Sequence, residues 1–510
     1  MDYAYVLRVA AGKFPTRRAV LSRDGTVTFA DLDDLVDRTA RALAGQGLAG
    51  QTVASILLNE PSTIAVYLGL ARIGAVSVPV NTRLTADERR YVVENAGASA
   101  LVVDHEFAAA GLALRDAVDA VGQVLITNGG HAGAADLDEL VAQQHSGEYQ
   151  AQVPGDRVAT VMYTSGTTGF PKGVMRTHDA NLWNVANSAL GSPRRPDDLE
   201  FFTLPIFGIG FMHFALPTLL AGGCLLLDRA FDPERTWELI AQHRPSRIFL
   251  APTMIDSMLA VPGSDRVDAS CLEIIYSAYE FPEPLRRRAL ERFGDRFVYM
   301  YGLTEAQLTA AASGEFAAKP TSAGKPMGLM RVRIVDDTGA SVPSGTVGEI
   351  ALEGPAVMAG YLGLPDATAE TLRDGWVYTG DLGYLDADGD VHFAGRKKEI
   401  IKTGGFTVDP VEVEHRLFEF AEIREAAVVG VPDEHWGEMV VAFVVATPGA
   451  TVDEQRVRTH CRERLADYKV PKAVRTLDKL PKNPTGKIER GRLRALWADT
   501  ARSTQGGHAS

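Results

Sequence analysis

The sequence predicts an α/β protein: a large N-terminal domain of parallel sheets covered by helices plus a small β-barrel-like region, followed by a small mobile α+β C-terminal domain. Apolar runs of strand length alternate with stretches of helical periodicity in the first part of the chain, which is the pattern of parallel strands joined by helices. The 510 residues also exceed what a single hydrophobic core usually serves. At least two domains are therefore expected.

Each element predicted in the first part rests on such a run. We expect strands at residues 52–58, 75–80, 100–103 and 123–127, and helices at residues 29–46 and 88–95. From residue 332 to 391 the pattern changes to short segments separated by turn residues, which favours a more antiparallel region. Residues 386–390 resemble the beginning of a calcium loop, but the twelfth position is Lys397 where a glutamate is required, so a hairpin turn is predicted.

A smaller α+β unit is predicted near the end of the chain. We expect a helix at residues 410–417, strands at 425–431 and 440–447, and a helix at 452–465. We place the N-terminal domain at residues 1–397, a mobile C-terminal lid domain at 398–500 and a frayed tail at 501–510.

Composition limits the classes of partner. A net charge of −13, from 52 basic and 65 acidic side chains, disfavours nucleic acid and anionic membranes. The three cysteines, Cys224, Cys271 and Cys461, have no pairing or metal-ligand spacing, which fits a reducing compartment. The N-terminus has no basic segment followed by an apolar one, and the apolar runs at 67–80 and 214–227 are too short to span a membrane. We expect a cytoplasmic protein that is a monomer or a homodimer.

The stretch YTSGTTGFPKGV at residues 163–174 concentrates glycines, hydroxyls and a lysine directly after the strand-like residues 158–162. Glycines let backbone amides approach an anion, Ser and Thr add donors, and Lys172 adds positive charge. Lys172 is followed by Gly173, so this is not a Walker loop. A flexible polar linker is the alternative for a stretch of this composition.

A second motif, Tyr301-Gly302-Leu303-Thr304-Glu305, follows the strand-like residues 297–300. Glu305 is therefore expected at the C-terminal edge of a sheet, where open α/β sheets bind their ligands. A glutamate beside a phosphate loop can hold Mg²⁺, and Tyr301 offers a ring face for a nucleobase. A strand end followed by a helix cap is the alternative.

Two further motifs carry single charged groups in rigid turns. Asp381, in the stretch GWVYTGDLG at residues 375–383, can accept both hydroxyls of a ribose, and Arg396 follows fifteen residues later. Lys487 lies in PKNPTGKI at residues 481–488, a turn made rigid by proline and glycine. For Asp381 the alternative is a turn residue, and for Arg396 and Lys487 it is a surface charge.

These four motifs, in this order, resemble the adenylate-forming superfamily over about residues 5–495, and residues 399–414 and 429–438 resemble its acyl-CoA synthetase branch. The resemblance resolves the glycine-rich stretch in favour of a phosphate loop. It implies that a carboxylate attacks the α-phosphorus of MgATP to give an acyl-adenylate and pyrophosphate, after which the small domain rotates and the thiol of CoA attacks the adenylate. ATP, Mg²⁺, CoA and a small carboxylic acid are the implied ligands.

The same resemblance implies the role of each residue. The phosphates would be held by Thr164, Ser165, Gly166, Thr167, Thr168, Gly169 and Lys172. Glu305 would hold Mg²⁺, Tyr301 the adenine and Asp381 the ribose. Lys487 would bridge the carboxylate and the α-phosphate, and Lys398 matches the hinge.

The resemblance also implies two sets of lining residues. Further nucleotide-binding positions would be Ala278, Tyr279, Glu280, Gly302, Thr304, Arg396 and Lys402. The acyl pocket would be lined by Phe207, Gly208, His213, Tyr279, Gly302 and Leu303.

The sequence departs from the family pattern at three places. Gly208 stands where a histidine or aromatic residue usually follows Leu-Pro-x-Phe, and His213 either replaces it or is a core residue. Tyr279 and Glu280 stand where small residues and proline are common, so Glu280 either recognises a polar group of the substrate or points to water. Thr407 stands where many CoA ligases carry Gln or Asn.

We therefore predict an ATP-dependent acid:CoA ligase. An aryl, arylacrylic or medium-chain acid is favoured over a long-chain fatty acid, because the bulky Tyr279 would shorten the pocket. One alternative keeps adenylation but changes the acid or the acceptor, as in amino-acid activation, transfer to a separate carrier protein, or an ATP-dependent diazotase that activates nitrite for an aryl amine. A non-catalytic nucleotide-binding protein is the second alternative, and the presence of Lys487 argues against it, because ATP binding alone does not need this lysine.

Overall fold

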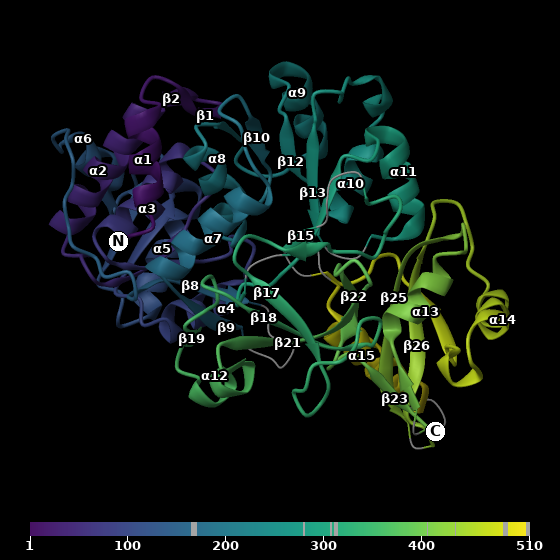
Figure 1. Cartoon of the computed structure of the whole chain (residues 1–510). Helices are drawn as coiled ribbons and strands as arrows, with labels where there is room; N and C mark the ends of the chain where they lie inside the picture. Colours follow the sequence, from purple (N-terminus) through teal and green to yellow (C-terminus); the bar gives the residue numbers. More distant parts are fainter. Residues whose placement is uncertain are drawn as a thin grey trace. The chain divides into compact units, whose positions relative to one another are not determined.

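The structure is a computed structural model. It describes residues 1–164, 171–278, 281–306, 309–310, 315–404, 406–433, 435–482 and 488–505 (Figure 1). The chain divides into two compact units. The first consists of Met1–Ala278, Asp295–Arg333 and Ala351–Thr379, and the second of Tyr279–Gly294, Ile334–Ile350 and Gly380–Ser510. The domain boundary at residue 398 stays a prediction.

The first unit contains a nine-stranded sheet. Its order is β16 (Lys325–Pro326), β15 (Thr309–Ala310), β14 (Phe297–Tyr301), β13 (Ile274–Ala278), β12 (Arg247–Phe249), β10 (Leu199–Phe202), β11 (Cys224–Leu227), β1 (Arg18–Ser22) and β2 (Gly25–Thr28). The strands from β14 to β1 pair in parallel, and the outer strands pair antiparallel.

An eight-stranded sheet also belongs to this unit. Its order is β19 (Gly360–Tyr361), β9 (Lys172–Thr177), β8 (Val158–Thr164), β4 (Val76–Pro79), β3 (Thr52–Ile56), β5 (Ala100–Asp104), β6 (Gln123–Thr127) and β7 (Ala135–Asp136). Its pairs from β8 to β7 are parallel, whereas β9 runs antiparallel to both β8 and β19. The predicted parallel sheets are confirmed.

Helices bury both faces of the eight-stranded sheet, which explains why its strands read as continuous apolar runs. Val53 and Val102 belong to the core shared with strands of the nine-stranded sheet and with α1 (Tyr5–Lys13), α2 (Phe29–Gly45) and α3 (Pro61–Arg72). Their neighbours Ala54 and Val103 point to the opposite face and pack with α4 (Ala86–Asn95) and α5 (Ala108–Ala117). This alternation is the period of two expected of a strand.

Local capping sets where α4 begins. The side chain of Thr85 accepts from the backbone N–H of Glu88, and the Glu88 carboxylate accepts from the N–H of Thr85, which is a capping box. The helix therefore starts two residues before the predicted position. The remaining helices of this unit are α6 (Leu137–Ala142), α7 (His178–Gly191), α8 (Leu216–Leu220), α9 (Pro233–His243), α10 (Pro252–Leu259) and α12 (Pro365–Thr371).

A five-stranded sheet occupies the region predicted to be antiparallel. Its order is β17 (Arg331–Val335), β18 (Gly348–Glu353), β21 (Trp376–Leu385) and β20 (Leu372–Arg373), and β22 (Val391–Arg396) pairs with β21. The pairs β20–β21 and β21–β22 are antiparallel.

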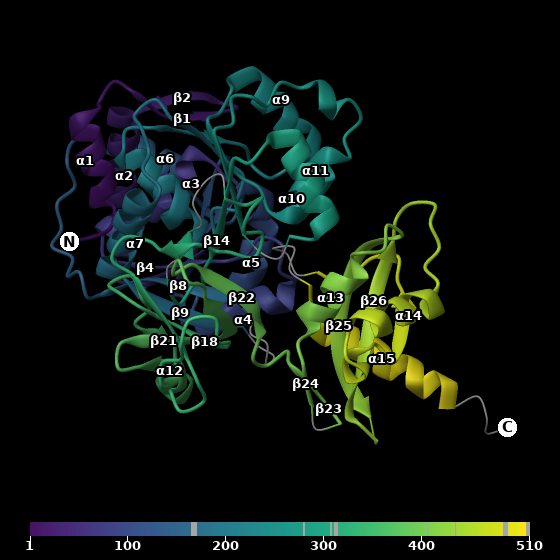
Figure 2. The same cartoon turned by 45° about the vertical axis from the view of Figure 1, so that its right-hand side comes forward.

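The second unit contains α11 (Glu283–Phe293) and a sheet ordered β24 (Phe406–Val408), β23 (Ile401–Thr403), β26 (Gly437–Ala446) and β25 (Ile423–Asp433), with β27 (Ala473–Thr476) beside β26 (Figure 2). Val428 and Ala442 face α13 (Pro410–Leu417) and α14 (Glu454–Arg464). Val429 and Phe443 face α15 (Arg490–Gln505). The predicted α+β unit is confirmed, with helix 410–417 at the predicted bounds.

Within the described part of the chain, none of the helices combines the length and the apolar character needed to cross a bilayer.

Candidate active site

The predicted phosphate loop lies in sequence between two paired strands of the first unit. Thr164 at the end of β8 lies opposite Lys172 at the start of β9, so the two predicted residues face each other across the base of the loop. Ser165, Gly166, Thr167, Thr168 and Gly169 lie outside the described residues.

Both sides of this base are tied to α4. The Tyr163 hydroxyl donates to Asn95 Oδ1 at 2.6 Å, and the Tyr91 hydroxyl donates to the Pro171 carbonyl at 3.2 Å. Tyr91 and Asn95 are four residues apart, so they lie on one face of the helix. The helix therefore fixes the chain just before and just after the loop.

The second motif begins at the C-terminal edge of the nine-stranded sheet. Ala278 at the end of β13 lies opposite Met300 in the parallel strand β14, so Tyr301 and Ala278 end at the same edge, as predicted. Gly302, Leu303, Thr304 and Glu305 follow and are half-buried. Tyr279 and Glu280 lie outside the described residues.

Glu305 and Lys172 meet at a residue that the sequence did not single out. The Tyr361 hydroxyl donates to Glu305 Oε1 at 2.9 Å, and Lys172 Nζ lies 4.8 Å from the centre of the Tyr361 ring. Tyr361 reaches this place because β19 pairs with β9, with Tyr361 opposite Val174 (Figure 1). Burial and the negative charge of Glu305 raise the pKa of Tyr361 above its usual range, so its hydroxyl stays protonated and donates.

Arg176 is a second residue beside the predicted motif that the sequence did not indicate. It is fully buried, and its guanidinium donates to the carbonyls of Thr304 at 2.9 Å and Ala356 at 3.0 Å. Burial lowers the pKa of Arg176 to about 10, and Glu305 acts in the opposite direction, so the group stays charged at neutral pH. An arginine in the apolar alternation of β9 is the signal that could have found it.

One amide fixes the segment that carries the predicted acyl-pocket residues. Asn59 is buried, its Nδ2 donates to the Leu204 carbonyl at 2.9 Å, and its Oδ1 accepts from the Ile206 N–H at 2.8 Å. Phe207 and Gly208 come directly after this clamp and are half-buried. Asn59 therefore determines where the pocket segment lies.

His213 lies in a short π-helical turn, Phe211–Ala215, a feature that often marks functional sites. It is 3% exposed, and neither ring nitrogen has a hydrogen-bond partner within the described part of the chain. Burial, together with the charges of Arg176 and Arg194, lowers the pKa of His213 to about 3. The imidazole is therefore neutral at physiological pH and retains one donor and one acceptor.

The second unit carries the predicted ribose-binding pair. Asp381 and Arg396 lie opposite each other in β21 and β22, and Arg396 Nε is 2.8 Å from Asp381 Oδ1. Asp381 is 1% exposed, so its charge is compensated by a neighbour on the adjacent strand. Lys398 is exposed in the turn after β22, and Lys487 lies outside the described residues.

An exposed aromatic surface lies elsewhere in the second unit, formed by Phe406, Trp436, Tyr468 and Lys472. Phe406, 56% exposed, stacks on Tyr468 with the ring centres 4.5 Å apart. Lys472 Nζ lies 5.2 Å from the centre of the Trp436 ring. Lys402, predicted to bind nucleotide, is also exposed in this unit. Two aromatic side chains, Phe406 and Trp436, are therefore exposed in this unit, and a lysine lies over the ring of Trp436.

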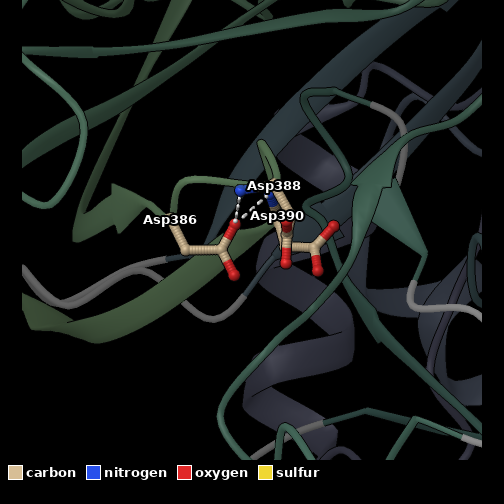
Figure 3. A group of neighbouring side chains, drawn as sticks. All are labelled: Asp386, Asp388 and Asp390. Carbon is tan, nitrogen blue, oxygen red and sulfur yellow. Dashed lines mark hydrogen bonds between the residues drawn. The ribbon is translucent and has the colours of Figure 1, made fainter.

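Three acidic side chains at residues 386–390 form the predicted hairpin turn (Figure 3). Asp386 Oδ1 accepts from the N–H groups of Asp388 and Asp390, each at 2.9 Å, and His392 Nε2 is 3.2 Å from Asp386 Oδ2. The turn's own hydrogen bonds account for the arrangement of the three carboxylates.

Comparison with known proteins identifies the family. A family described as AMP-binding enzyme matches residues 7–362, and the AMP-binding enzyme C-terminal domain matches residues 412–487. A feruloyl-CoA synthase of Amycolatopsis sp is 37% identical over 496 residues, which are 95% of this chain and 98% of that protein. The chain belongs to the AMP-binding enzyme family and is an enzyme of its AMP-forming acid–CoA ligase group.

Two solved structures share the whole fold. The amide bond synthetase McbA from Marinactinospora thermotolerans is 30% identical, with a TM-score of 0.89 over 97% of this chain and 100% of that chain. The anthranilate CoA ligase AuaEII in complex with anthranoyl-AMP is 27% identical, with a TM-score of 0.90 over 98% of each chain.

Proposed function

We propose that this enzyme is an ATP-dependent ligase that converts an aryl, arylacrylic or medium-chain carboxylic acid into its acyl-adenylate and then transfers the acyl group to CoA. The observation that carries this proposal is the meeting of Lys172 and Glu305 at Tyr361. A phosphate-binding lysine and a metal-binding carboxylate at one place suit a triphosphate. The anthranoyl-AMP held by a solved relative supports an adenylate intermediate.

Each predicted site residue has one role in the proposed adenylation. Thr164, Lys172 and the loop between them would bind the phosphates, and Tyr301 the adenine. The buried Asp381, held by Arg396, would accept the ribose hydroxyls. Lys487 would place the attacking carboxylate against the α-phosphorus, so that catalysis comes from positioning and neutralised charge.

Glu305 is chemically suited to Mg²⁺. A carboxylate has about four lone-pair sites, and the hydrogen bond from Tyr361 occupies one of them. Mg²⁺ is usually bound through one or two carboxylates together with substrate phosphates, so a single glutamate beside the phosphate loop is an adequate protein ligand. The bound ion would supply positive charge to the triphosphate oxygens.

The exposed aromatic surface of the second unit favours CoA as the acceptor. Trp436 is 38% exposed and Phe406 is 56% exposed. Partly exposed rings with a lysine nearby suit the adenine and phosphates of CoA, since stacking and charge can act together there. The feruloyl-CoA relative supports the same acceptor.

The acyl pocket favours a bulky acid. A Cβ atom placed on Gly208 would meet the Pro205 carbonyl at 3.5 Å and no other described atom outside its chain neighbours within 4 Å, so the missing side chain leaves room. The neutral His213 adds a polar group in apolar surroundings, next to Phe214. A feruloyl and an anthranilate ligase among the relatives support an arylacrylic or aryl acid.

A different acceptor is the second candidate. McbA is an amide bond synthetase with the same fold along the full chain, so an amine could replace the thiol without a change of architecture. Transfer to a carrier protein and the activation of nitrite or of an amino acid are further variants of this candidate.

The test is mass spectrometry of products formed from MgATP and a panel of aryl, arylacrylic, medium-chain and amino acids, with and without CoA, an amine or nitrite. An acyl-CoA accompanied by AMP is the expected result. AMP release that requires an amine or nitrite, without a thioester, would assign the second candidate. No AMP with any acid of the panel, despite measurable ATP binding, would contradict both candidates.

A further inference from the structure

Tyr361 contacts the charged groups of two motifs that are far apart in the sequence. Its hydroxyl donates to Glu305, and its ring lies under Lys172. Its backbone N–H donates to Thr368 Oγ1 at 2.9 Å, and it is 7% exposed and packed with Val174 and Met358. The ring and the hydroxyl are therefore held in place from several sides.

The two charges at Tyr361 do not neutralise each other. No ion pair within 4.0 Å joins Lys172 to Glu305, although the structure describes both residues and both contact Tyr361, one at its ring and the other at its hydroxyl. Opposite charges a few ångströms apart attract each other by about 4 kcal/mol near a protein surface. A direct pair would remove the lysine from the phosphates and the carboxylate from the metal.

We propose that Tyr361 is a positioning residue for adenylation that keeps Lys172 and Glu305 apart and fixes both for MgATP. The inference rests on the proposed function, because it assigns the same site to MgATP. The hydroxyl fixes the carboxylate through a hydrogen bond to a charged group, and the ring face holds the ammonium by a cation–π contact. The rest of the ring packs into the apolar cluster with Val174 and Met358.

Two substitutions separate these contributions. Tyr361→Phe keeps the ring and removes only the hydroxyl, so it frees Glu305 and leaves Lys172 in place. Tyr361→Leu removes the ring as well and lets the two charges form a direct pair. Tyr3→Phe is the matched control, because Tyr3 is also buried and its hydroxyl donates to the Tyr67 carbonyl at 3.3 Å, away from this site.

The measurement is the dissociation constant of ATP by isothermal titration calorimetry, with Mg²⁺ and in EDTA without metal. For Tyr361→Phe we expect MgATP to bind about ten-fold more weakly, the usual effect of losing a hydrogen bond to a charged group. Metal-free ATP should bind as in the wild type. For Tyr361→Leu both MgATP and metal-free ATP should bind more weakly, because Lys172 loses its ring contact as well and pairs with Glu305 instead of the phosphates.

Several outcomes would overturn the inference. Unchanged MgATP binding by Tyr361→Phe would show that the hydroxyl positions nothing. If Tyr361→Phe weakens the binding of MgATP and of metal-free ATP equally, and melts at a lower temperature than Tyr3→Phe, the role of the hydroxyl is purely structural. If the wild type binds neither form of ATP, the proposed function fails instead. The acid KM of Tyr361→Phe should stay unchanged, and a rise there would also contradict a role at the phosphates.

Discussion

At Gly208, in the predicted acyl pocket, the absence of a side chain leaves space. A Cβ atom there would approach only the Pro205 carbonyl among the described atoms, at 3.5 Å. At Gly210 the same addition would come within 2.6 Å of Leu204 Cδ1. Two neighbouring glycines therefore have different tasks, the first leaving space and the second allowing close packing.

We expect Gly208→Leu to fold normally and to select smaller acids. The new side chain would fill space that a bulky acid needs, and the loss of a few methylenes of room is worth about ten-fold or more in selectivity. The check is the ratio of kcat/KM for an arylacrylic acid to that for a short aliphatic acid. Gly210→Ala is the control and should lower the melting temperature instead. An unchanged ratio for Gly208→Leu would place the acid elsewhere.

His213 predicts a pH dependence of stability. Its pKa falls from 6.5 to about 3 on folding because of burial and the charges of Arg176 and Arg194. The unfolded chain thus binds a proton below pH 6.5 that the folded chain does not bind, so stability decreases as the pH falls from 6.5 towards 3. His213 can lower the free energy of unfolding by at most about 1.4 kcal/mol for each pH unit in this range.

We therefore expect His213→Phe to lose less stability on acidification than the wild type. The check is the urea midpoint at pH 6.5, 5.5 and 4.5, the window set by the ordinary and lowered pKa values of His213. His131→Asn, at an exposed position, is the control and should show the wild-type dependence. Parallel curves for His213→Phe and the wild type would contradict a neutral buried imidazole.

At the scale of elements, the pocket segment depends on a side chain from another part of the chain. Asn59 lies 145 residues from Leu204 in sequence and bonds to its carbonyl. It also accepts from the Ile206 N–H, so one buried amide replaces the backbone partners that this irregular segment lacks. The position of Phe207 and Gly208 follows from this clamp.

We expect Asn59→Asp to raise the KM for the acid about ten-fold while the KM for ATP stays unchanged. The new carboxylate can still accept a hydrogen bond from the Ile206 N–H, but it cannot donate to the Leu204 carbonyl and repels it. Steady-state kinetics with each substrate varied in turn provide the check. Gln123→Ala removes one amide hydrogen bond, to the Gln46 carbonyl at 3.0 Å, and is the control. Equal changes in both KM values would indicate general destabilisation.

Elements were predictable where a pattern is local. Residues 123–127 and 410–417 form a strand and a helix at the predicted bounds, because continuous apolar runs and an Asp-Pro start are strong signals. Strand β25, Ile423–Asp433, extends past its predicted ends. Its long antiparallel pairing with β26 adds residues that their own periodicity does not mark.

At the scale of the whole molecule, the two half-reactions are predicted to need different placements of the C-terminal domain. Lys398 lies in the turn between β22 and β23 and is exposed. A hinge absorbs a rotation in one or two backbone positions, and proline fixes φ at such a position.

We expect Lys398→Pro to retain one half-reaction and to lose the other. Pyrophosphate exchange reports adenylation, and thioester formation from a supplied acyl-adenylate reports the second step. Lys398→Ala removes the charge without fixing the backbone and should retain both. Loss of both steps in Lys398→Pro with a wild-type melting temperature would argue against a hinge at this position.

We expect Lys487→Ala to slow adenylation and to leave the transfer to CoA intact. Losing one preorganised charge commonly costs about 10² to 10³ in rate, so pyrophosphate exchange should fall by this factor. Thioester formation from a supplied acyl-adenylate should remain close to the wild-type rate. A matching loss in both steps would assign Lys487 a role beyond the attack on ATP.

The fold class could be read from local periodicity and is confirmed, whereas the phosphate loop and the roles of Glu305, Asp381 and Lys487 were predicted from short runs of chemically distinctive residues. The residues that contact Glu305 and Thr304 became apparent only in the folded chain. Tyr361 meets Glu305 across 56 residues of sequence, and Arg176 meets Thr304 across 128. Such contacts depend on the order and register of strands, which no local pattern encodes.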